Sequence, residues 1–344
     1  MRFREFEGEW KEITLEECTT NIVSGRTKPN IAGKFPVYGS MGIIGFCDIP
    51  THKGKYLLIA RVGANAGSIN NVEGEFSVTD NTLILEIIED FSIDYLYQKL
   101  LSYNLNKLIF GSGQPLITGG QLKCLNLFFP GITEQTKIAG LLQLIDERIS
   151  TQSQIIESLE TLIKDLIHSI IKGQEVNILL KDCLNCHSST LMENAIIEKN
   201  GIYPVYGAIG TIAYTTDYKI NEDSILIIKD GTSVGKVQYA KNKYSVIGTL
   251  NYLTPKENIS LKYLYYYLQT FNFDKYIVGS GIPHIYFKNY GNEYIYCPDI
   301  EKQNEIANLL SLIDEKLEIE KQILKNIPNK KSIFLLICLY KHLI

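Results

Sequence analysis

The stretch FPVYGSMGIIGF, from Phe35 to Phe46, recurs 168 residues later as YPVYGAIGTIAY, from Tyr203 to Tyr214. Each copy places β-branched and aromatic residues on both sides of a Gly-containing turn, which is typical of a short β-hairpin. The offset continues without a gap as far as IAGLLQLIDERI (138–149) and IANLLSLIDEKL (306–317), with about a third of the paired positions identical. The chain is therefore a tandem duplication, and each structural feature is expected twice.

Each repeat has two parts with different periodicity. The first part is β-rich, with short apolar runs such as YLLIARVG separated by Gly, Asn and Asp turns. It contains one clear helix, SIDYLYQKLLS (92–102) in the first repeat and SLKYLYYYLQT (260–270) in the second, and each begins with Ser in the N-cap position. The second part spaces apolar residues by three and four over 133–172, which predicts a helix of nearly 40 residues.

A long helix with one narrow apolar stripe needs a partner helix to cover that stripe. The second repeat supplies the partner, because the segment from Glu301 carries the same stripe. We therefore expect an α+β fold in which two tandem β-rich domains are separated by two long helices. The economical arrangement of the helices is an antiparallel coiled-coil strut, with the two domains related by a pseudo-two-fold axis.

Composition places the chain among ordinary soluble proteins, with 344 residues and 45% hydrophobic residues. The first residues lack the apolar segment of a secretory signal, and the apolar run 333–340 is too short to span a bilayer. We therefore expect a cytoplasmic protein. Its seven cysteines, an odd number without framework spacing, predict reduced thiols and no disulfide.

The net charge of −4 does not by itself favour nucleic-acid binding, which depends on Lys and Arg. The distribution of charge is more informative than its sum. One segment, IIKDGTSVGKVQYAKNKY, concentrates Lys229, Lys236, Lys241 and Lys243 within strand and turn sequence. This segment is either a solvated Lys-rich surface or a phosphate-contacting one, and the sequence leaves both interpretations open.

The order of the parts and three repeated motifs resemble a known family. The chain opens with RFREFEGEWKEITLEEC, each β-rich part contains GSG-x-P-x-I, and P-x-I followed by Gln and IA-x-LL-x-x-ID opens each long helix. This pattern resembles the DNA-specificity subunit of type I restriction-modification systems. The resemblance covers almost the whole chain.

The resemblance implies target-recognition domains at 1–132 and 173–299, a first spacer helix at 133–172, and a second spacer helix with an atypical tail at 300–344. Each domain would read one half of a bipartite site in double-stranded DNA. The helices would set the spacing and dock two methyltransferase subunits, which motor-nuclease subunits then join. In such a complex this chain is a non-catalytic recognition subunit.

The sequence departs from this pattern after Ile323, where it continues as NIPNKKSIFLLICLYKHLI. Proline removes a helix hydrogen bond and kinks or stops a helix. We expect this effect at Pro328, with either a shorter strut on that side or a tail that packs against a partner.

Three short motifs suggest chemistry that their context contradicts. CLNCH (183–187) has the form of a haem attachment site, but the first repeat has only its first cysteine. GTSVGKV (231–237) has one residue too few between its glycines for a phosphate-binding P-loop, and Val follows the Lys. PDIEK (298–302) corresponds to PGITE in the first repeat, where a helix start explains both. We expect no catalytic residue, no metal and no cofactor, so methyl transfer must come from a partner.

Candidate DNA-reading residues are those in the turns of the β-rich parts whose side chains suit base edges or phosphates. The candidates are Arg26, Lys28, Tyr38, Ser40, Arg61, Asn65 and Gln114 in the first repeat, and Tyr206, Lys229, Thr232, Ser233, Lys236, Gln238 and Lys243 in the second. Each one is alternatively an ordinary surface side chain, and Tyr38 and Tyr206 are alternatively core aromatics. The alternative for the whole chain is a symmetric scaffold or adaptor that binds protein or a small ligand.

Overall fold

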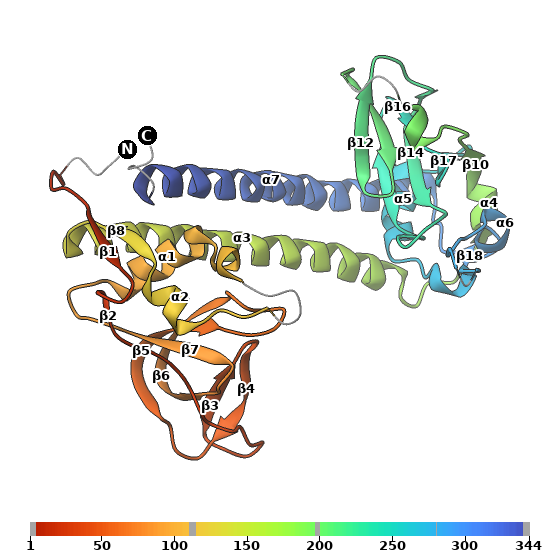
Figure 1. Cartoon of the computed structure of the whole chain (residues 1–344). Coiled ribbons are helices and arrows are strands. Elements are labelled where there is room, and N and C mark those ends of the chain that lie inside the picture. The colour runs from red at the N-terminus through yellow and green to blue at the C-terminus, as the bar shows by residue number, and fades with distance from the viewer. Residues whose placement is uncertain (1–4, 110–114, 197–199, 280, 340–344) are drawn as a thin grey trace. The chain divides into compact units, whose positions relative to one another are not determined.

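The computed structural model describes residues 5–109, 115–196, 200–279 and 281–339, and the side chains as far as residue 327 (Figure 1). The chain divides into two compact units. The first contains residues 1–152 and 323–344, and the second contains residues 153–322. The β-rich part of each unit is called its head below.

The first head is built on one six-stranded sheet with the order β2-β7-β5-β6-β3-β4. Its strands are β2 (Thr19–Ser24), β3 (Phe35–Gly39), β4 (Gly42–Cys47), β5 (His52–Ala60), β6 (Ile69–Val78) and β7 (Thr82–Ile87). Neighbouring strands are antiparallel except β3 and β6, which run parallel. The predicted hairpin at 35–46 is β3–β4, and a separate pair joins β1 (Lys11–Thr14) to β8 (Asn126–Phe129).

Helices close one side of this sheet. They are α1 (Ile93–Tyr103), the short helices η1 (Leu105–Leu108) and α2 (Gly119–Lys123), and the start of α3 (Ile132–Ile171). Leu57 and Leu85 of the sheet, Leu96 of α1, and Ile138 and Leu142 of α3 share one buried core. Burial of these apolar side chains holds the sheet, α1 and the long helix together.

The second head contains counterparts of these elements but has two four-stranded sheets, with the orders β10-β17-β14-β15 and β12-β11-β16-β13. The strands are β10 (Leu184–Ser188), β11 (Tyr203–Gly207), β12 (Gly210–Thr215), β13 (Ile220–Asn221), β14 (Ser224–Ile228), β15 (Val237–Ala240), β16 (Lys243–Val246) and β17 (Leu250–Pro255). A two-stranded sheet joins β9 (Ile178–Leu179) to β18 (Tyr294–Ile295), and the helices are α4 (Leu180–Cys183), η2 (Glu193–Ala195), α5 (Leu261–Gln269), η3 (Asp274–Tyr276), α6 (Phe287–Tyr290) and the start of α7 (Ile300–Leu339).

A buried glutamine ties the head to the long helix in both units. In the first, Gln135 Oε1 accepts a hydrogen bond from Ser92 N at 2.9 Å, and its Nε2 donates to Pro130 O at 2.9 Å. In the second, Gln303 Oε1 accepts from Ser260 N at 2.8 Å, and its Nε2 donates to Pro298 O at 2.7 Å. The Gln of the repeated helix-opening motif is therefore structural, since it bonds the chain just before the short helix and just before the long one.

Within the second unit the two long helices pack antiparallel, as predicted. Ile167 of α3 contacts the same small cavity as Ile306 of α7, whereas Glu160 of α3 pairs with Lys321 of α7 at 3.0 Å. Later residues of α3 thus lie beside earlier residues of α7. The helix predicted over 133–172 is confirmed as α3, which spans 132–171.

Of the two effects expected at Pro328, a kink or a stop, the stop is wrong, because α7 passes through Pro328 and continues to Leu339. Proline removes one hydrogen bond and crowds one carbonyl, but a helix tolerates a local disturbance when its hydrogen bonds on both sides remain.

The cysteines Cys18, Cys47, Cys124, Cys183, Cys186 and Cys297 are free thiols, as expected for residues without disulfide spacing. Among the residues that the structure describes, none of the helices is both long enough and apolar enough to cross a membrane.

Candidate nucleic-acid interface

Three of the predicted residues of the first head, Tyr38, Ser40 and Arg61, bond the turn between β6 and β7, which consists of Thr79, Asp80 and Asn81. Ser40 Oγ donates to Asn81 O at 3.2 Å, and Arg61 N donates to the same carbonyl at 3.0 Å. Thr79 N donates to Tyr38 O at 3.0 Å. Two segments that are far apart in sequence, 38–40 and the segment at Arg61, therefore meet at one turn.

Arg26 and Lys28 approach the same turn from the segment after β2. Gly25 N donates to Thr82 O, and Thr27 N donates to Val78 O, so the backbone is anchored on both sides of the turn. A Cβ at Gly25 would lie 2.0 Å from Val78 O, which makes glycine necessary for this approach. Arg26 and Lys28 are exposed and alternate with the anchored residues. We call Arg26, Lys28, Tyr38, Ser40 and Arg61 the first turn cluster.

The second head repeats the arrangement at the turn Ile247–Thr249 between β16 and β17. Ile247 N donates to Tyr206 O at 3.1 Å, and Lys229 N donates to Thr249 O at 2.9 Å. Lys229 occupies the position of Arg61, since Arg61 follows β5 and Lys229 follows β14, the equivalent strand. The Arg61 carbonyl accepts a hydrogen bond from Ile117 N, and the Lys229 carbonyl accepts one from Ile285 N; both isoleucines end the GSG-x-P-x-I motif. We call Tyr206, Lys229 and the turn Ile247–Thr249 the second turn cluster. The two clusters thus hold a cationic residue at equivalent backbone positions.

The loop after this cation has the same backbone in both heads. Gly63 and Gly67 have φ of +78° and +89°, and their counterparts Gly231 and Gly235 have φ of +101° and +84°. Gly63 N donates to Pro115 O and Gly231 N donates to Pro283 O, in each case the proline of the GSG-x-P-x-I motif. Asn65, Thr232 and Ser233 lie within these loops, where positive φ requires glycine on either side.

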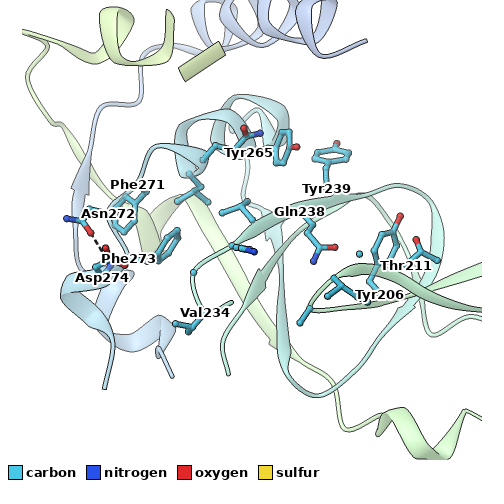
Figure 2. A pocket seen from close by; sticks show the side chains of 18 of the residues that line it. Tyr206, Thr211, Val234, Gln238, Tyr239, Tyr265, Phe271, Asn272, Phe273 and Asp274 are labelled. Atoms are coloured by element: carbon cyan, nitrogen blue, oxygen red, sulfur yellow. Dashed lines mark hydrogen bonds between the residues drawn. The ribbon is translucent and has the colours of Figure 1, made fainter. Parts of the chain in front are cut away.

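A groove of about 1110 Å³ opens in the second unit between the hairpin β11–β12, strand β15, the end of α5 and α7 (Figure 2). Tyr206, Lys236 and Gln238, three of the predicted residues, line it. Gln238 Nε2 donates to Gly207 O at 2.9 Å, which fixes the amide beside the hairpin. Burial raises the pKa of Tyr206, so its hydroxyl stays neutral and can donate a hydrogen bond.

Not every predicted residue joins these clusters. Lys243 lies at the start of β16, at the end of the sheet away from the β11–β12 turn, with its Nζ 4.9 Å from the Tyr218 ring centroid. Tyr38 and Tyr206 pack edge-on against Phe76 and Tyr244, so they are half-buried core aromatics as well as cluster members. Gln114 lies outside the described residues.

Sequence reasoning missed three polar side chains at these places. Asn81 is exposed at the centre of the first turn cluster, and Gln269 and Asn272 line the groove from the end of α5. Asn and Gln are the side chains that suit adenine. Asn81 was detectable as part of the turn signal TDN, whereas Gln269 and Asn272 are brought to the groove only by the packing of α5.

The motifs with misleading chemical signatures have structural roles. In CLNCH, Cys183 is buried, and His187 Nε2 forms a 3.0 Å hydrogen bond with Thr254 Oγ1 while its ring stacks on Tyr252. GTSVGKV forms the loop between β14 and β15, and PDIEK forms the start of α7. Across the described part of the chain, no group of three or more His, Cys, Asp or Glu side chains could hold a metal ion.

Comparison with known proteins defines the class. The profile of the type I restriction modification DNA specificity domain matches the chain twice, over residues 7–161 and 176–329. These two matches cover most of both repeats, so the chain belongs to the type I restriction-modification specificity family.

Individual relatives agree with this assignment. The specificity subunit of the type I restriction enzyme EcoprrI of Escherichia coli is 30% identical over 165 residues, which cover 45% of this chain and 40% of that protein. A Mycoplasma pneumoniae protein named as a type I specificity subunit is 26% identical over 303 residues, 82% of each chain. The match thus spans less than half of the E. coli protein but most of the mycoplasmal one.

Among solved structures, the S subunit of a type I restriction-modification system from M. genitalium superposes with a TM-score of 0.76. It covers 98% of this chain and 97% of its own length, with 19% sequence identity. At that identity the likeness establishes the fold.

Proposed function

We propose that this chain is the non-catalytic DNA-recognition subunit of a type I restriction-modification complex, and that each head reads one half of a bipartite site. The observation that carries the proposal is the cation that both heads hold at the same place, Arg61 in the first turn cluster and Lys229 in the second. Residues 1–132 and 173–299 are the reading domains in this proposal, and 133–172 and 300–344 are the spacer.

The chemistry of the turn clusters suits duplex DNA. Arg and Lys hydrogen-bond guanine in the major groove or neutralise phosphates, and Asn and Gln suit adenine. The first turn cluster carries three cations, Arg26, Lys28 and Arg61, on a protein whose net charge is −4. Cations concentrated at one turn support binding to phosphates despite the overall negative charge.

The proposal assigns methyl transfer and cleavage to other subunits. The sequence has no cofactor loop, and the motifs that suggested other chemistry have structural roles in the fold. We propose that two methyltransferase subunits dock on the long helices and that motor-nuclease subunits join them. The chain supplied alone with S-adenosylmethionine should not methylate DNA; methylation by the isolated chain would refute the assignment.

The decisive experiment replaces the shared cation one head at a time. The complex of the full chain with its methyltransferase should methylate a bipartite motif that genome-wide methylation sequencing identifies. Arg61→Ala should lower discrimination in one half-site only, and Lys229→Ala should do so in the other, by about tenfold to a hundredfold at one base pair. If either change altered both half-sites equally, the heads would not be independent readers.

Matched controls are available at cations away from the turn clusters. Lys53, whose side chain is 81% exposed, pairs with Glu75, and Lys219, 70% exposed, pairs with Asp217. Lys53→Ala and Lys219→Ala remove the same positive charge from their heads, so they should leave base discrimination unchanged. A loss of discrimination in these controls would show that net charge, and not the cluster position, determines reading.

The proposal also gives the long helices the role of setting the half-site spacing. Inserting four residues after Ser158 in α3 adds about one helical turn, roughly 6 Å, and nearly preserves the phase of the apolar stripe. The motif methylated by this variant should keep both half-sites and gain one to two base pairs between them, since base pairs rise about 3.4 Å. One pair is the expected gain, because each added pair also rotates the second half-site around the duplex by roughly 34 to 36°. An active variant that retains the original spacing would show that the long helices do not set the distance between the half-sites.

A further inference from the structure

Each head exposes an apolar side chain at the tip of its first hairpin. Met41 in the turn between β3 and β4 is 82% exposed, and Ile209 in the turn between β11 and β12 is 89% exposed. The two residues occupy equivalent positions in the repeats. Single exposed apolar residues are common. Tight turns, however, favour Gly, Pro, Asn, Asp and Ser, so the same apolar choice in both copies at a tip requires a reason.

Both tips are held firmly by the candidate interface. Gly39 pairs with Gly42, and Gly207 with Gly210, so that only two residues form each turn. Next to Met41, Ser40 Oγ bonds the Asn81 carbonyl that Arg61 N also bonds. In the second head, Gln238 Nε2 bonds Gly207 O immediately before the turn. A fixed tip presents its side chain in one direction and loses little freedom on binding.

The surroundings of the tips indicate the kind of partner. Ile209 lines the same groove as Lys236 and Gln238, and Met41 adjoins the first turn cluster with its three cations. Beyond the tip, the first hairpin also exposes Ile43 (55%) and Ile44 (46%) of β4, whereas their equivalents in the second hairpin are the polar Thr211 and the half-buried Ile212. The feature common to both tips is therefore one apolar side chain beside cations. This combination matches a duplex groove, in which phosphates line the edges and the 5-methyl group of thymine is the apolar feature of the floor.

We propose that Met41 and Ile209 are base-reading residues, each packing its side chain against the 5-methyl group of a thymine in the major groove of its own half-site. This inference rests on the proposed function and adds a specific contact to it. It assigns part of the sequence discrimination to van der Waals contact at the hairpin tips, next to the hydrogen bonds that the polar residues of the turn clusters make.

The test uses a duplex that carries the bipartite motif, in which each thymine is replaced in turn by deoxyuridine, which lacks only the methyl group. The probe is bound by the full chain in complex with its methyltransferase, and the dissociation constant is measured by fluorescence anisotropy. One replacement in each half-site should weaken binding by the wild-type complex about fourfold to tenfold, the expected effect of losing one buried methyl contact.

The tip variants complete a double-mutant cycle. Ile209→Ser should weaken binding to the thymine duplex by a similar factor and abolish the effect of deoxyuridine at that position in the second head's half-site only. Met41→Ser should do the same in the other half-site. Both side chains are exposed, so neither change should alter folding, which thermal unfolding of the free chain checks.

Controls come from the opposite end of each hairpin. Ile202, which is 77% exposed, directly precedes β11, and Ile49, 79% exposed, follows β4. Ile202→Ser and Ile49→Ser should preserve wild-type binding and the wild-type response to deoxyuridine. Equal losses in tip and control variants would overturn the inference.

Failure of the inference can be told from failure of the proposed function. The inference is overturned if the wild-type complex binds its motif tightly but no deoxyuridine position matters, if the tip variants keep the deoxyuridine effect, or if a half-site contains no thymine. The proposed function is overturned if the wild-type complex does not distinguish its motif from a scrambled duplex.

Discussion

The two heads come from one duplicated sequence, yet the first has a single six-stranded sheet and the second has two sheets of four strands. The difference lies at one pair of positions. In the first head Gly54 of β5 and Gly74 of β6 face each other with φ of +125° and +118°, and both strands continue through them. In the second head the equivalents of these residues are Glu222 and Asn242, and the strands break there.

The pairing on either side of the break is unchanged. Ile220 pairs with Tyr244 just as their equivalents His52 and Phe76 pair in the first head. Asn242 adopts φ +56°, the left-handed region that Asn tolerates, and its N–H donates to Asp223 Oδ1 at 2.9 Å. Two extended glycines thus carry a sheet through a bend, whereas Asn and Asp turn the same bend into a tight turn.

What both heads retain is the connection to the long helix and the cation of the turn cluster. Tyr95 OH donates to Phe128 O at 3.0 Å, and its counterpart Tyr263 OH donates to Tyr296 O at 2.7 Å, beside the paired glutamines. The features that position a head are therefore repeated, while strand continuity varies between heads. Differences between the heads can be tested by changing matched residues in each.

The largest expected effect is symmetric. Gln135→Leu and Gln303→Leu each remove the two paired hydrogen bonds described above from a side chain that is 2% exposed, and leave a backbone N–H and a carbonyl without their partner. Gln303→Leu also removes a longer bond, from Nε2 to Asn258 O at 3.5 Å. Each change should lower the free energy of unfolding of its own head by about 2–4 kcal/mol, because unsatisfied buried polar groups are costly. Hydrogen exchange at the amides of α1 and α5 measures each head separately.

Controls for this prediction are Gln143→Leu and Gln322→Leu, which change exposed glutamines of the same helices. They should alter the free energy of unfolding by less than about 0.5 kcal/mol. A large loss in one head and a negligible loss in the other would show that Gln135 and Gln303 do not connect their heads to the long helices in the same way.

The second effect is asymmetric and depends on pH. Lys99 of α1 is 4% exposed, with its Nζ 5.9 Å from the Trp10 ring centroid, whereas the equivalent residue of α5 is Tyr267. Burial lowers the pKa of Lys99 from 10.5 to about 8. Between these values the unfolded chain binds more protons than the folded one, so the Lys99 contribution to stability rises with pH from about 8 to about 10.5.

Below pH 8 the Lys99 ammonium is charged in the folded chain, and its burial lowers the free energy of unfolding. Lys99→Met should remove this destabilisation. The variant should exceed the wild type in free energy of unfolding by roughly 2–3 kcal/mol at pH 7, and the gap should shrink as pH approaches 10. Lys107→Met is the control, because Lys107 is exposed although its Nζ is also 5.9 Å from an aromatic centroid, that of Tyr103. A pH-independent gap would mean that Lys99 is not held at a lowered pKa.

Much of the fold follows from the sequence because the repeat doubles each local signal. The hairpins and the Ser that precedes each short helix are local features, and they lie where predicted. The split of the second sheet was not predictable from strand propensity. In the first head, strands β5 and β6 stay continuous because Gly54 and Gly74 face each other, and the second head has Glu222 and Asn242 at these positions. Local sequence does not report such pairing.

The candidate site was predictable only in part, for the same reason. Arg61 and Lys229 can be proposed from sequence because turn residues with suitable chemistry are visible there. The meeting of Arg61 with Ser40 and Arg26 at one turn depends on contacts between segments far apart in the chain. Lys243 was selected by its place in a Lys-rich run, and β16 carries it to the other end of the sheet.

The bend between strands gives the third prediction. Gly54→Ala places a Cβ on a residue with φ +125°, so the first head should lose about 1–2 kcal/mol of unfolding free energy.

Asn242→Ala should cost the second head about 1 kcal/mol, because alanine resists the left-handed conformation. Asn242→Gly should be tolerated within about 0.5 kcal/mol, since glycine adopts positive φ freely and the backbone bond to Asp223 remains. Urea unfolding with hydrogen exchange at β5 and β14 measures both heads, and a tolerated Gly54→Ala would show that this glycine does not sustain the six-stranded sheet.

The smallest effect separates two serines that look alike in sequence. Ser92 caps α1, with its side chain accepting a hydrogen bond from Tyr95 N at 3.2 Å, whereas Ser260 before α5 makes no side-chain cap bond. Both backbone N–H groups still donate to their glutamine, so replacing either serine by alanine leaves that connection intact. Ser92→Ala should therefore cost about 1 kcal/mol, the usual value of an N-cap, and Ser260→Ala only a few tenths. Hydrogen exchange at the first amides of α1 and α5 reports the local loss. Equal costs would mean that Ser260 forms the cap bond in solution, and the two helix starts would then be equal in energy although Ile93 and Asp94 are replaced by Leu261 and Lys262.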